Sequence, residues 1–389
     1  NEVTWRRLIC RASVGRVGLK ITARPTEALQ MSLLHVTSLA TAELPNTSHG
    51  VFRAQHELGG GSNLGLMMTH RQSMSAISDH NLVVGLDGAW RGSGTPMLAE
   101  GFAAVSLDGD GQPEDSSMIG GMAGAKLRWR GELVRPELTY LYVHPDFQAD
   151  LGFIRRTAIQ SFDGGLLVEP RPTSMGLEKM QLWVGGGVIT DETFETLLDW
   201  RSGAGVGIFG ANGYGGRLNV GFSSELIDEA FDVGLKTVEP GRYEGLGVHV
   251  SLWTPHNAPL MVSPYLELGD YYDGSITTAG VHANLRPVQA LRFDGDVRYD
   301  HATFEGGGDF DSLVINGAVN ADFMTDLGLK VQVGWSQLDD RLQLQSRLRW
   351  SYLPGSDLFL VYQADLNSDA TTLAFQSLQL KVTFRYPWQ

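Results

Sequence analysis

Residues 292–300 read Arg-Phe-Asp-Gly-Asp-Val-Arg-Tyr-Asp. Apolar or small side chains alternate with charged side chains along this stretch. Because successive side chains of a β-strand point to opposite faces, the stretch predicts a strand with one apolar face and one charged face. This combination is typical of a transmembrane β-barrel, whose strands turn apolar side chains to lipid and polar side chains to an enclosed lumen.

The same alternation returns along most of the chain. It is clearest in 329–336, 341–350 and 378–386, and weaker copies occupy 82–90, 123–129, 180–184, 246–252, 277–285 and 315–323. No stretch shows sustained helical spacing, and no apolar run reaches the roughly 18 residues of a transmembrane helix. No Pro/Ser-rich linker divides the chain. We therefore predict an all-β protein in which residues 1–389 form a single transmembrane, antiparallel outer-membrane β-barrel domain.

The connections between the predicted strands differ in length. With the C-terminus in the periplasm, four short turns fall on the periplasmic side, at 255–258, 286–289, 324–326 and 353–356, and the long stretch 302–311 falls outside. Further long connections are 107–118, 143–160 and 223–241. Short periplasmic turns opposite longer external loops are what this barrel class requires. A spacing of about 15 to 20 residues per strand predicts roughly 16 to 22 strands, with about 20 as the best figure.

A soluble β-sandwich or propeller also has alternating strands. A closed barrel of this size with its apolar face inward would enclose a space too wide for side chains to fill. Aromatic residues near the predicted strand ends further favour the membrane barrel, because such barrels carry aromatic girdles at both interfaces. These residues are Trp253, Tyr271, Tyr272, Trp335, Trp350, Tyr352, Tyr386 and Trp388.

Charge and termini narrow the class of protein. The formal net charge of −14 argues against nucleic acid as a partner. The basic stretch 126–130 alternates as a strand does, so its charges are assigned to the lumen rather than to an RNA-binding patch. The single cysteine, Cys10, excludes an internal disulfide. The chain opens without a signal peptide, which predicts a mature or truncated form of an exported protein, with 1–13 as an N-terminal extension or the remnant of a missing upstream domain.

Several blocks of sequence resemble an uncharacterised family of bacterial outer-membrane barrels. They are 61–65 (Gly-Ser-Asn-Leu-Gly), 69–71 (Thr-His-Arg), 84–87 (Val-Gly-Leu-Asp), 146–147 (Asp-Phe), 152–156 (Gly-Phe-Ile-Arg-Arg), 269–274 and, most specifically, 347–362. In that family the barrel usually follows a domain similar to carbohydrate-binding family nine. The resemblance implies the fold and an outer-membrane location, but no activity. The carbohydrate-binding-like domain is missing here, so sugar binding is not transferred.

The polar residues of the predicted strands could form a catalytic site or a plain lumen wall. A serine hydrolase could use His282 and Asn284 with Ser263 or Ser275, since His282 and Asn284 share one strand face. Same-face polar residues are also what any lumen wall supplies. The carboxylates of Asp294, Asp296 and Asp300 alternate with arginines, which indicates charge neutralisation along a wall rather than a poised acid and base. The sequence therefore predicts no catalytic residues and no enzyme.

Metal and cofactor sites are poorly supported. Asp108, Asp110 and Glu114 offer oxygen ligands at nearby positions, which makes them a weak Ca²⁺ candidate. Pro113 stands where an EF-hand loop needs glycine, and Ile119 supplies no carboxylate at the twelfth position. A solvated acidic loop explains these residues equally well. The histidines show no close pairing suited to zinc, and no haem-attachment motif occurs. We predict no metal site and no cofactor.

The segment 143–160 is the most specific candidate for function. It is a long, non-alternating stretch between strands, and long loops in large barrels often fold inward to constrict the passage. Arg155 and Arg156 could bind an anionic ligand or pin the segment to a wall carboxylate such as Asp294 or Asp296. The predicted ligand or constriction residues are Arg155, Arg156, Asp294, Asp296, Arg298, Arg347 and Arg349.

These observations favour a porin-like outer-membrane channel with a mixed-charge lumen that passes or binds a small solute. An alternative is a structural barrel with a plugged lumen that anchors a protein complex, and an outer-membrane hydrolase comes third. The expected partners are outer-membrane lipid and periplasmic or surface protein subunits, and nucleic acid is excluded.

Overall fold

The computed structural model describes residues 4–13, 16–40, 45–75, 79–110, 118–172, 175–234, 236–338, 340–367 and 373–383. Within these ranges every regular element is a β-strand. No helix in this part of the chain is long and apolar enough to cross a membrane. The chain divides into two compact units, one formed by Asn1–Val168 with Trp183–Ser202 and the other by Glu169–Leu182 with Gly203–Gln389.

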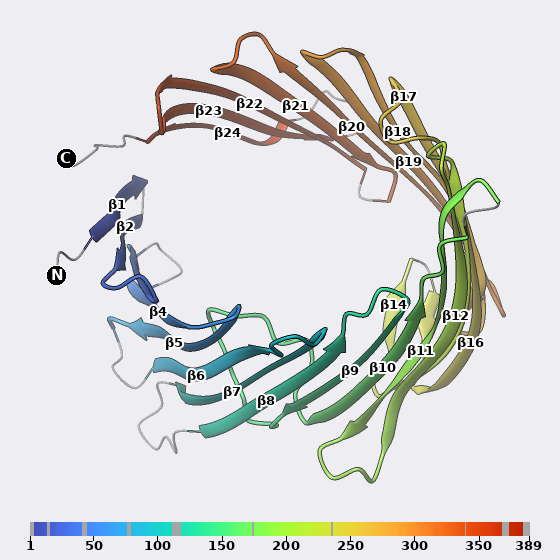
Figure 1. The fold of residues 1–389 in the computed structure, drawn as a ribbon, viewed down its shortest axis with the longest axis horizontal. Helices are drawn as coiled ribbons and strands as arrows, with labels where there is room; N and C mark the ends of the chain where they lie inside the picture. Colours follow the sequence, from blue (N-terminus) through green and yellow to red (C-terminus); the bar gives the residue numbers. More distant parts are fainter. Residues whose placement is uncertain are drawn as a thin grey trace. The chain divides into compact units, whose positions relative to one another are not determined.

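The first unit is a curved antiparallel sheet in which each strand pairs with the next along the chain (Figure 1). Its strands are β1 (Thr4–Ser13), β2 (Arg16–Arg24), β3 (Leu29–Ser38), β4 (Thr47–Gly59), β5 (Ser62–Ser73), β6 (Asp79–Arg91), β7 (Met97–Asp110), β8 (Met118–Trp129), β9 (Val134–Val143) and β10 (Ile159–Val168). The stretch that the sequence assigns to an extension, 1–13, thus contributes a strand over Thr4–Ser13.

The second unit repeats this sequential antiparallel pairing from β13 onward. Its strands are β13 (Gly215–Ile227), β16 (Gly241–Trp253), β17 (Leu260–Tyr271), β18 (Gly274–Val288), β19 (Leu291–Phe304), β20 (Phe310–Asp322), β21 (Leu327–Ser336), β22 (Arg341–Leu353), β23 (Ser356–Asn367) and β24 (Leu373–Val382). A small hairpin, β14 (Phe231–Val233) with β15 (Lys236–Val238), lies between β13 and β16 in the sequence.

The strands β11 (Leu177–Asp191) and β12 (Leu197–Gly210) complete the main sheet, which holds 22 strands among the described residues. This count falls at the upper end of the predicted range. The predicted long connections at 143–160 and 223–241 are confirmed, because residues 144–158 and 228–240 separate β9 from β10 and β13 from β16. The connection predicted at 302–311 is shorter, since β19 continues to Phe304 and β20 begins at Phe310, and most of 107–118 lies outside the described residues. The predicted turn at 286–289 begins later than expected, since β18 continues to Val288 past a bulge after Leu285.

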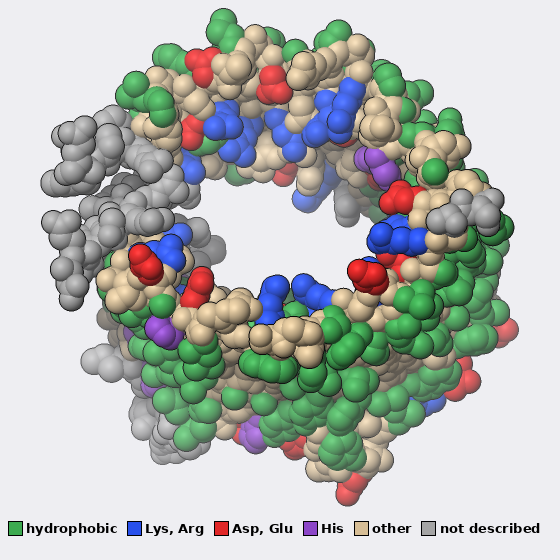
Figure 2. All heavy atoms as spheres, in the orientation of Figure 1, with side chains coloured by type: hydrophobic (Ala, Val, Ile, Leu, Met, Phe, Trp, Pro, Cys, Tyr) green, Lys and Arg blue, Asp and Glu red, His purple; other side chains and the backbone are tan. Residues whose placement is uncertain are grey.

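Strands whose side chains the structure describes have two chemically different faces, as the alternation predicts. Figure 2 shows charged side chains on the concave face of each unit and hydrophobic side chains on the convex face. Large apolar residues on the convex faces are strongly exposed, with Leu86 at 63% and Leu378 at 68% of full exposure. Monomeric soluble proteins rarely expose contiguous apolar surface on this scale. A face of this kind is suited to contact with lipid.

The strand ends carry the aromatic residues that the sequence predicts there. Trp253 is the last residue of β16, and Tyr271 is the last residue of β17. Trp350 and Tyr352 lie near the C-terminal end of β22, with ring centroids 6.0 Å apart. Tyr386 and Trp388 lie outside the described residues.

The hairpin that follows β22 has only two residues between Leu353 and its partner Ser356. Gly355 adopts a φ of 78° there, which glycine tolerates without steric cost.

Candidate functional site

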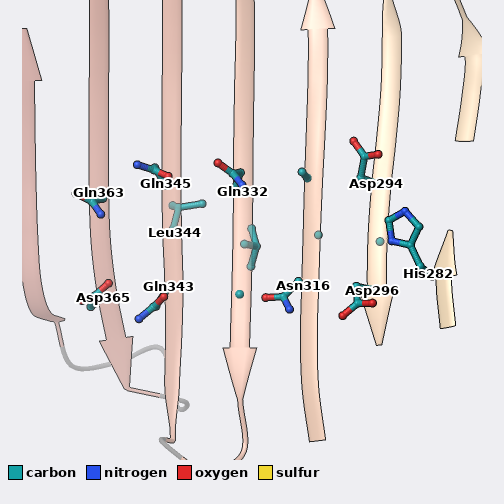
Figure 3. Close-up of a pocket in the computed structure, with 15 residues that line it drawn as sticks. His282, Asp294, Asp296, Asn316, Gln332, Gln343, Leu344, Gln345, Gln363 and Asp365 are labelled. Carbon is teal, nitrogen blue, oxygen red and sulfur yellow. The ribbon is translucent and has the colours of Figure 1, made fainter. Parts of the chain in front are cut away.

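A cavity of about 470 Å³ lies on the polar face of the second unit, over strands β18 to β23 (Figure 3). Side chains rich in carboxamide and carboxylate groups line it. The polar residues among them are His282, Asp294, Asp296, Asn316, Gln332, Gln343, Gln345, Gln363 and Asp365. No lysine or arginine belongs to the lining of this cavity.

Strand register places these side chains in two parallel rows. In one row Asp296 lies opposite Asn316 and Gln343 lies opposite Asp365, with Gly334 between Asn316 and Gln343. In the other row Asp294 and Gln332 flank Ala318, and Gln345 and Gln363 follow. Gly334 and Ala318 have almost no side chain, whereas the neighbouring amide side chains project from the sheet. Each row therefore has a depression at its small residue. The hollow is therefore a direct product of which residues share this face.

The amide groups in the cavity have unused hydrogen-bonding capacity. Gln332, Gln343 and Gln345 are exposed, and none of the five carboxamide side chains hydrogen-bonds to another described residue. The same holds for the side chains of His282, Asp296 and Asp365. Each carboxamide offers two N–H donors and one acceptor oxygen. The cavity thus presents both donors and acceptors to whatever occupies it.

Asp294 differs from the other carboxylates of the cavity. Arg292 donates from Nε to its Oδ2 at 2.9 Å, Asn320 donates to the same oxygen at 3.0 Å, and Asn284 donates to Oδ1. The charge of Asp294 is therefore balanced on its own sheet. Asp296 and Asp365 have no such ion pair within the described residues, so the cavity keeps a negative character.

The remaining arginines of the predicted set lie on the same polar face but outside the cavity. Arg298 pairs with Asp300 at 2.9 Å, and Arg349 pairs with Asp357 at 3.1 Å. Arg347 stacks its guanidinium 4.5 Å above the ring of Phe359. The polar face therefore alternates between paired charges and unpaired amides. These arginines and the aspartates of the cavity share one wall, as the sequence predicts, but they do not converge on one point.

The segment 144–158 folds against the polar face of the first unit. Asn81 on β6 is only 1% exposed and donates to Asp108 Oδ1 and to the Gln148 carbonyl, both at 3.1 Å. Its own Oδ1 accepts the backbone N–H of Asp150 at 3.1 Å. The hydroxyl of Ser106 accepts the N–H of Gln148 at 3.2 Å. The segment is thus tied to the wall rather than projecting away from it.

Packing and charge strengthen this attachment. Phe147 is buried, and its backbone passes so close to β8 that a Cβ on Gly120 would lie 2.3 Å from it. Arg71 on β5 forms an ion pair with Asp150. Arg156 forms an ion pair with Asp199 on β12 at 3.1 Å, whereas Arg155 is exposed and unpaired among the described residues.

In the described part of the chain, the geometry does not assemble the catalytic or metal-binding groups that the sequence offers. Ser263 lies opposite His282 in the register of β17 and β18, but its hydroxyl donates to the Leu252 carbonyl at 3.0 Å. Asp108 is buried beside Asn81, while Glu114 and the side chain of Asp110 lie outside what the structure describes. Among the described residues no group of three or more His, Cys, Asp or Glu side chains could hold a metal ion.

Two features of the site were not found from the sequence. The amide rows could have been found, because Gln343 and Gln345 alternate on one strand and Gln332 and Gln363 precede and follow them on the neighbouring strands. The role of Asn81 had no comparable signal, since its partners are distant in sequence.

The comparisons with known proteins concern the fold. No protein-family model matches the sequence, and no curated protein matches it either. Among solved structures, the chain is similar to the siderophore receptor PirA from Acinetobacter baumannii, with a TM-score of 0.55, 7% identity, and coverage of 90% of this chain and 73% of that one.

Two further receptors agree with this result. The ferric enterobactin receptor PfeA from Pseudomonas aeruginosa has a TM-score of 0.57 at 8% identity, over 93% of this chain and 73% of that one. The ferric preacinetobactin receptor BauA from Acinetobacter baumannii has a TM-score of 0.52 at 10% identity, over 98% of this chain and 78% of that one. The chain therefore has the fold of an outer-membrane β-barrel, and the bacterial outer membrane is the location to which this fold belongs. The more specific family resemblance in the sequence stays a prediction.

Proposed function

We propose that this protein is an outer-membrane channel that passes or binds a small solute along its polar face. One observation carries the proposal: the polar face holds a hollow in which five carboxamides and the carboxylates of Asp296 and Asp365 have no hydrogen-bond partners among the described residues. Barrels of this strand number enclose more space than their side chains fill. A polar wall around such a space supports movement of a hydrated solute rather than packing of a core.

The structural neighbours support a transport role of this general kind. They are receptors for siderophores and ferric chelates. Their sequence identity of 7–10% transfers none of those ligands to this chain. Paired charges of both signs along the wall, such as Arg298 with Asp300, favour weak ion selectivity over a strong preference for one sign.

Within this proposal the segment 144–158 narrows the passage. Arg155 is its exposed cation, and Arg156 fixes the segment to Asp199. Replacing both arginines with alanine should change single-channel conductance in planar bilayers, because it removes one free charge and one attachment point. Arg171→Ala is the matched control, since Arg171 is an exposed arginine in the connection between β10 and β11. Equal conductance in all three proteins would remove the segment from the pathway.

A second function is favoured by the strand count. Outer-membrane transporters with 22 strands contain a plug in the lumen, and the main sheet here has 22 strands among the described residues. In this second proposal the barrel anchors periplasmic or surface proteins, and one of them fills the interior. Purification in mild detergent distinguishes the two functions. Stable co-purifying subunits together with no channel activity would favour the anchor, and a conducting, isolated chain would favour the channel.

A further inference from the structure

We propose that the cavity over β18 to β23 is a binding site for a neutral, hydroxyl-rich solute of oligosaccharide size. The inference rests on the proposed solute passage and specifies the class of solute. It concerns the amide rows, which contain Gln332, Gln345 and Gln363 in direct cross-strand succession, and Asn316 and Gln343 in the neighbouring row.

The hydrogen-bonding groups of the cavity match those of a hydroxyl-rich solute. A hydroxyl group both donates and accepts, and so does a carboxamide. Five carboxamides without partners among the described residues therefore match a ligand that carries many hydroxyls along its length. Asp296 and Asp365 add acceptors for further hydroxyl donors. Arg298 and Arg349 on the same face, by contrast, already have carboxylate partners.

The charges of the lining favour a neutral solute over an anion. The lining contains no lysine or arginine, and the carboxylates of Asp296 and Asp365 lack ion pairs within the described residues. Lys330 and Arg347 stand on the same face, two positions along β21 and β22 from Gln332 and Gln345, but outside the lining. A cation would be drawn to these two carboxylates, but they stand on β19 and β23, at opposite ends of one row. The amides lie between them. A neutral solute can use the whole row, whereas a single metal ion can use only one end.

The dimensions of the cavity fit an elongated solute. The rows cross five strands, β19 to β23, which at about 4.8 Å between neighbouring strands is roughly 19 Å from end to end. Gly334 and Ala318 leave the floor open along this length. A chain of several sugar rings could lie across the strands and meet successive amides, whereas a single ring would reach only two or three of them.

Binding to the purified full chain in detergent micelles tests the inference without requiring an open channel. The probe is a neutral linear gluco-oligosaccharide, measured by titration calorimetry. A poly(ethylene glycol) of matched length serves as the reference, because it has ether acceptors but no donors along its chain. A sulfated form of the same oligosaccharide and Ca²⁺ are titrated separately. We expect the neutral oligosaccharide to bind at least about tenfold more tightly than any of the other three probes.

The variant Gln332→Ala/Gln345→Ala/Gln363→Ala should weaken oligosaccharide binding by about tenfold or more. These side chains have no hydrogen bonds to other described residues, so their removal leaves the sheet intact. Gln379→Ala is the matched control, because Gln379 is an exposed glutamine on the same face of β24 outside the cavity. No binding, equal binding to poly(ethylene glycol), tighter binding of Ca²⁺ or of the sulfated sugar, or full binding by the triple variant would overturn the inference.

Single-channel conductance separates this inference from the proposed function. A protein that conducts ions but does not bind the neutral oligosaccharide overturns only the choice of solute. A protein that binds the oligosaccharide but never conducts overturns the passage and leaves the site in place.

Discussion

Replacing Asn81 with alanine should release the segment 144–158 from the wall while leaving the sheet folded. The buried Asn81 side chain makes three hydrogen bonds, to Asp108, to the Gln148 carbonyl and from the Asp150 N–H. Two of these, with Gln148 and Asp150, tie the segment to the wall, whereas the bond to Asp108 joins β6 to β7. A typical hydrogen bond contributes about 0.5–1.5 kcal/mol net, so the two together contribute about 1–3 kcal/mol to the attachment. This loss corresponds to a roughly five- to 150-fold increase in the opening equilibrium of the segment.

Hydrogen exchange measured by mass spectrometry in detergent reports this opening directly. Peptides that cover 144–158 should exchange faster in Asn81→Ala, because the Asp150 N–H loses its acceptor. Peptides from β13 to β24 should exchange at the rate of the unaltered protein. The control is Asn367→Ala, which removes an exposed asparagine at the end of β23. Unchanged exchange over 144–158, or faster exchange throughout the sheet, would refute the attachment described here.

Two further predictions concern close packing and orientation. Gly120→Val should displace the segment 144–158 and raise its protease sensitivity, because even a Cβ at this position would lie 2.3 Å from the Phe147 backbone. Gly121→Val is the control and should have no such effect, because a Cβ there would have nothing within 4 Å. Equal protease sensitivity in both variants would contradict this packing. Leu380→Arg should destabilise the barrel in lipid by about 2–4 kcal/mol if Leu380 lies near the bilayer midplane, while Gln379→Arg on the other face should cost little. Denaturant titration of the lipid-embedded protein measures the loss of unfolding free energy in both variants. A larger loss for Gln379→Arg would show that the face of Gln379, and not that of Leu380, contacts lipid.

The fold was largely predictable from the sequence because apolar residues that face lipid alternate with polar residues that face the lumen along each barrel strand. The stretch 292–300 lies within β19, and Phe293, Val297 and Tyr299 are exposed there on the face opposite the charges. Connection lengths were also predictable, because turns interrupt the alternation. The strand count was less certain, since weak alternation in 123–129 and 180–184 marks only part of β8 and β11.

The candidate site was predictable only in part. The sequence identified the wall residues Asp294, Asp296 and Arg298, since charges on one strand face are visible in the alternation itself. It did not identify the hollow, because the cavity depends on small residues such as Gly334 and Ala318 falling beside amides on other strands. Strand register decides these neighbours, and register is fixed by pairing and turn geometry rather than by any single strand. The partner of Arg156 is hidden for the same reason, since Asp199 stands 43 positions away in sequence.

The central claim is that the apolar face of each strand meets lipid while the polar face meets water. Single spin labels at Leu380 and Gln379 on β24, introduced as cysteines in a Cys10→Ala background, test it most directly in lipid bilayers. The account predicts that the label at Leu380 is relaxed by oxygen dissolved in the lipid, and that the label at Gln379 is relaxed by a water-soluble nickel complex. The reverse pattern, or equal access of the nickel complex to both labels, would contradict it.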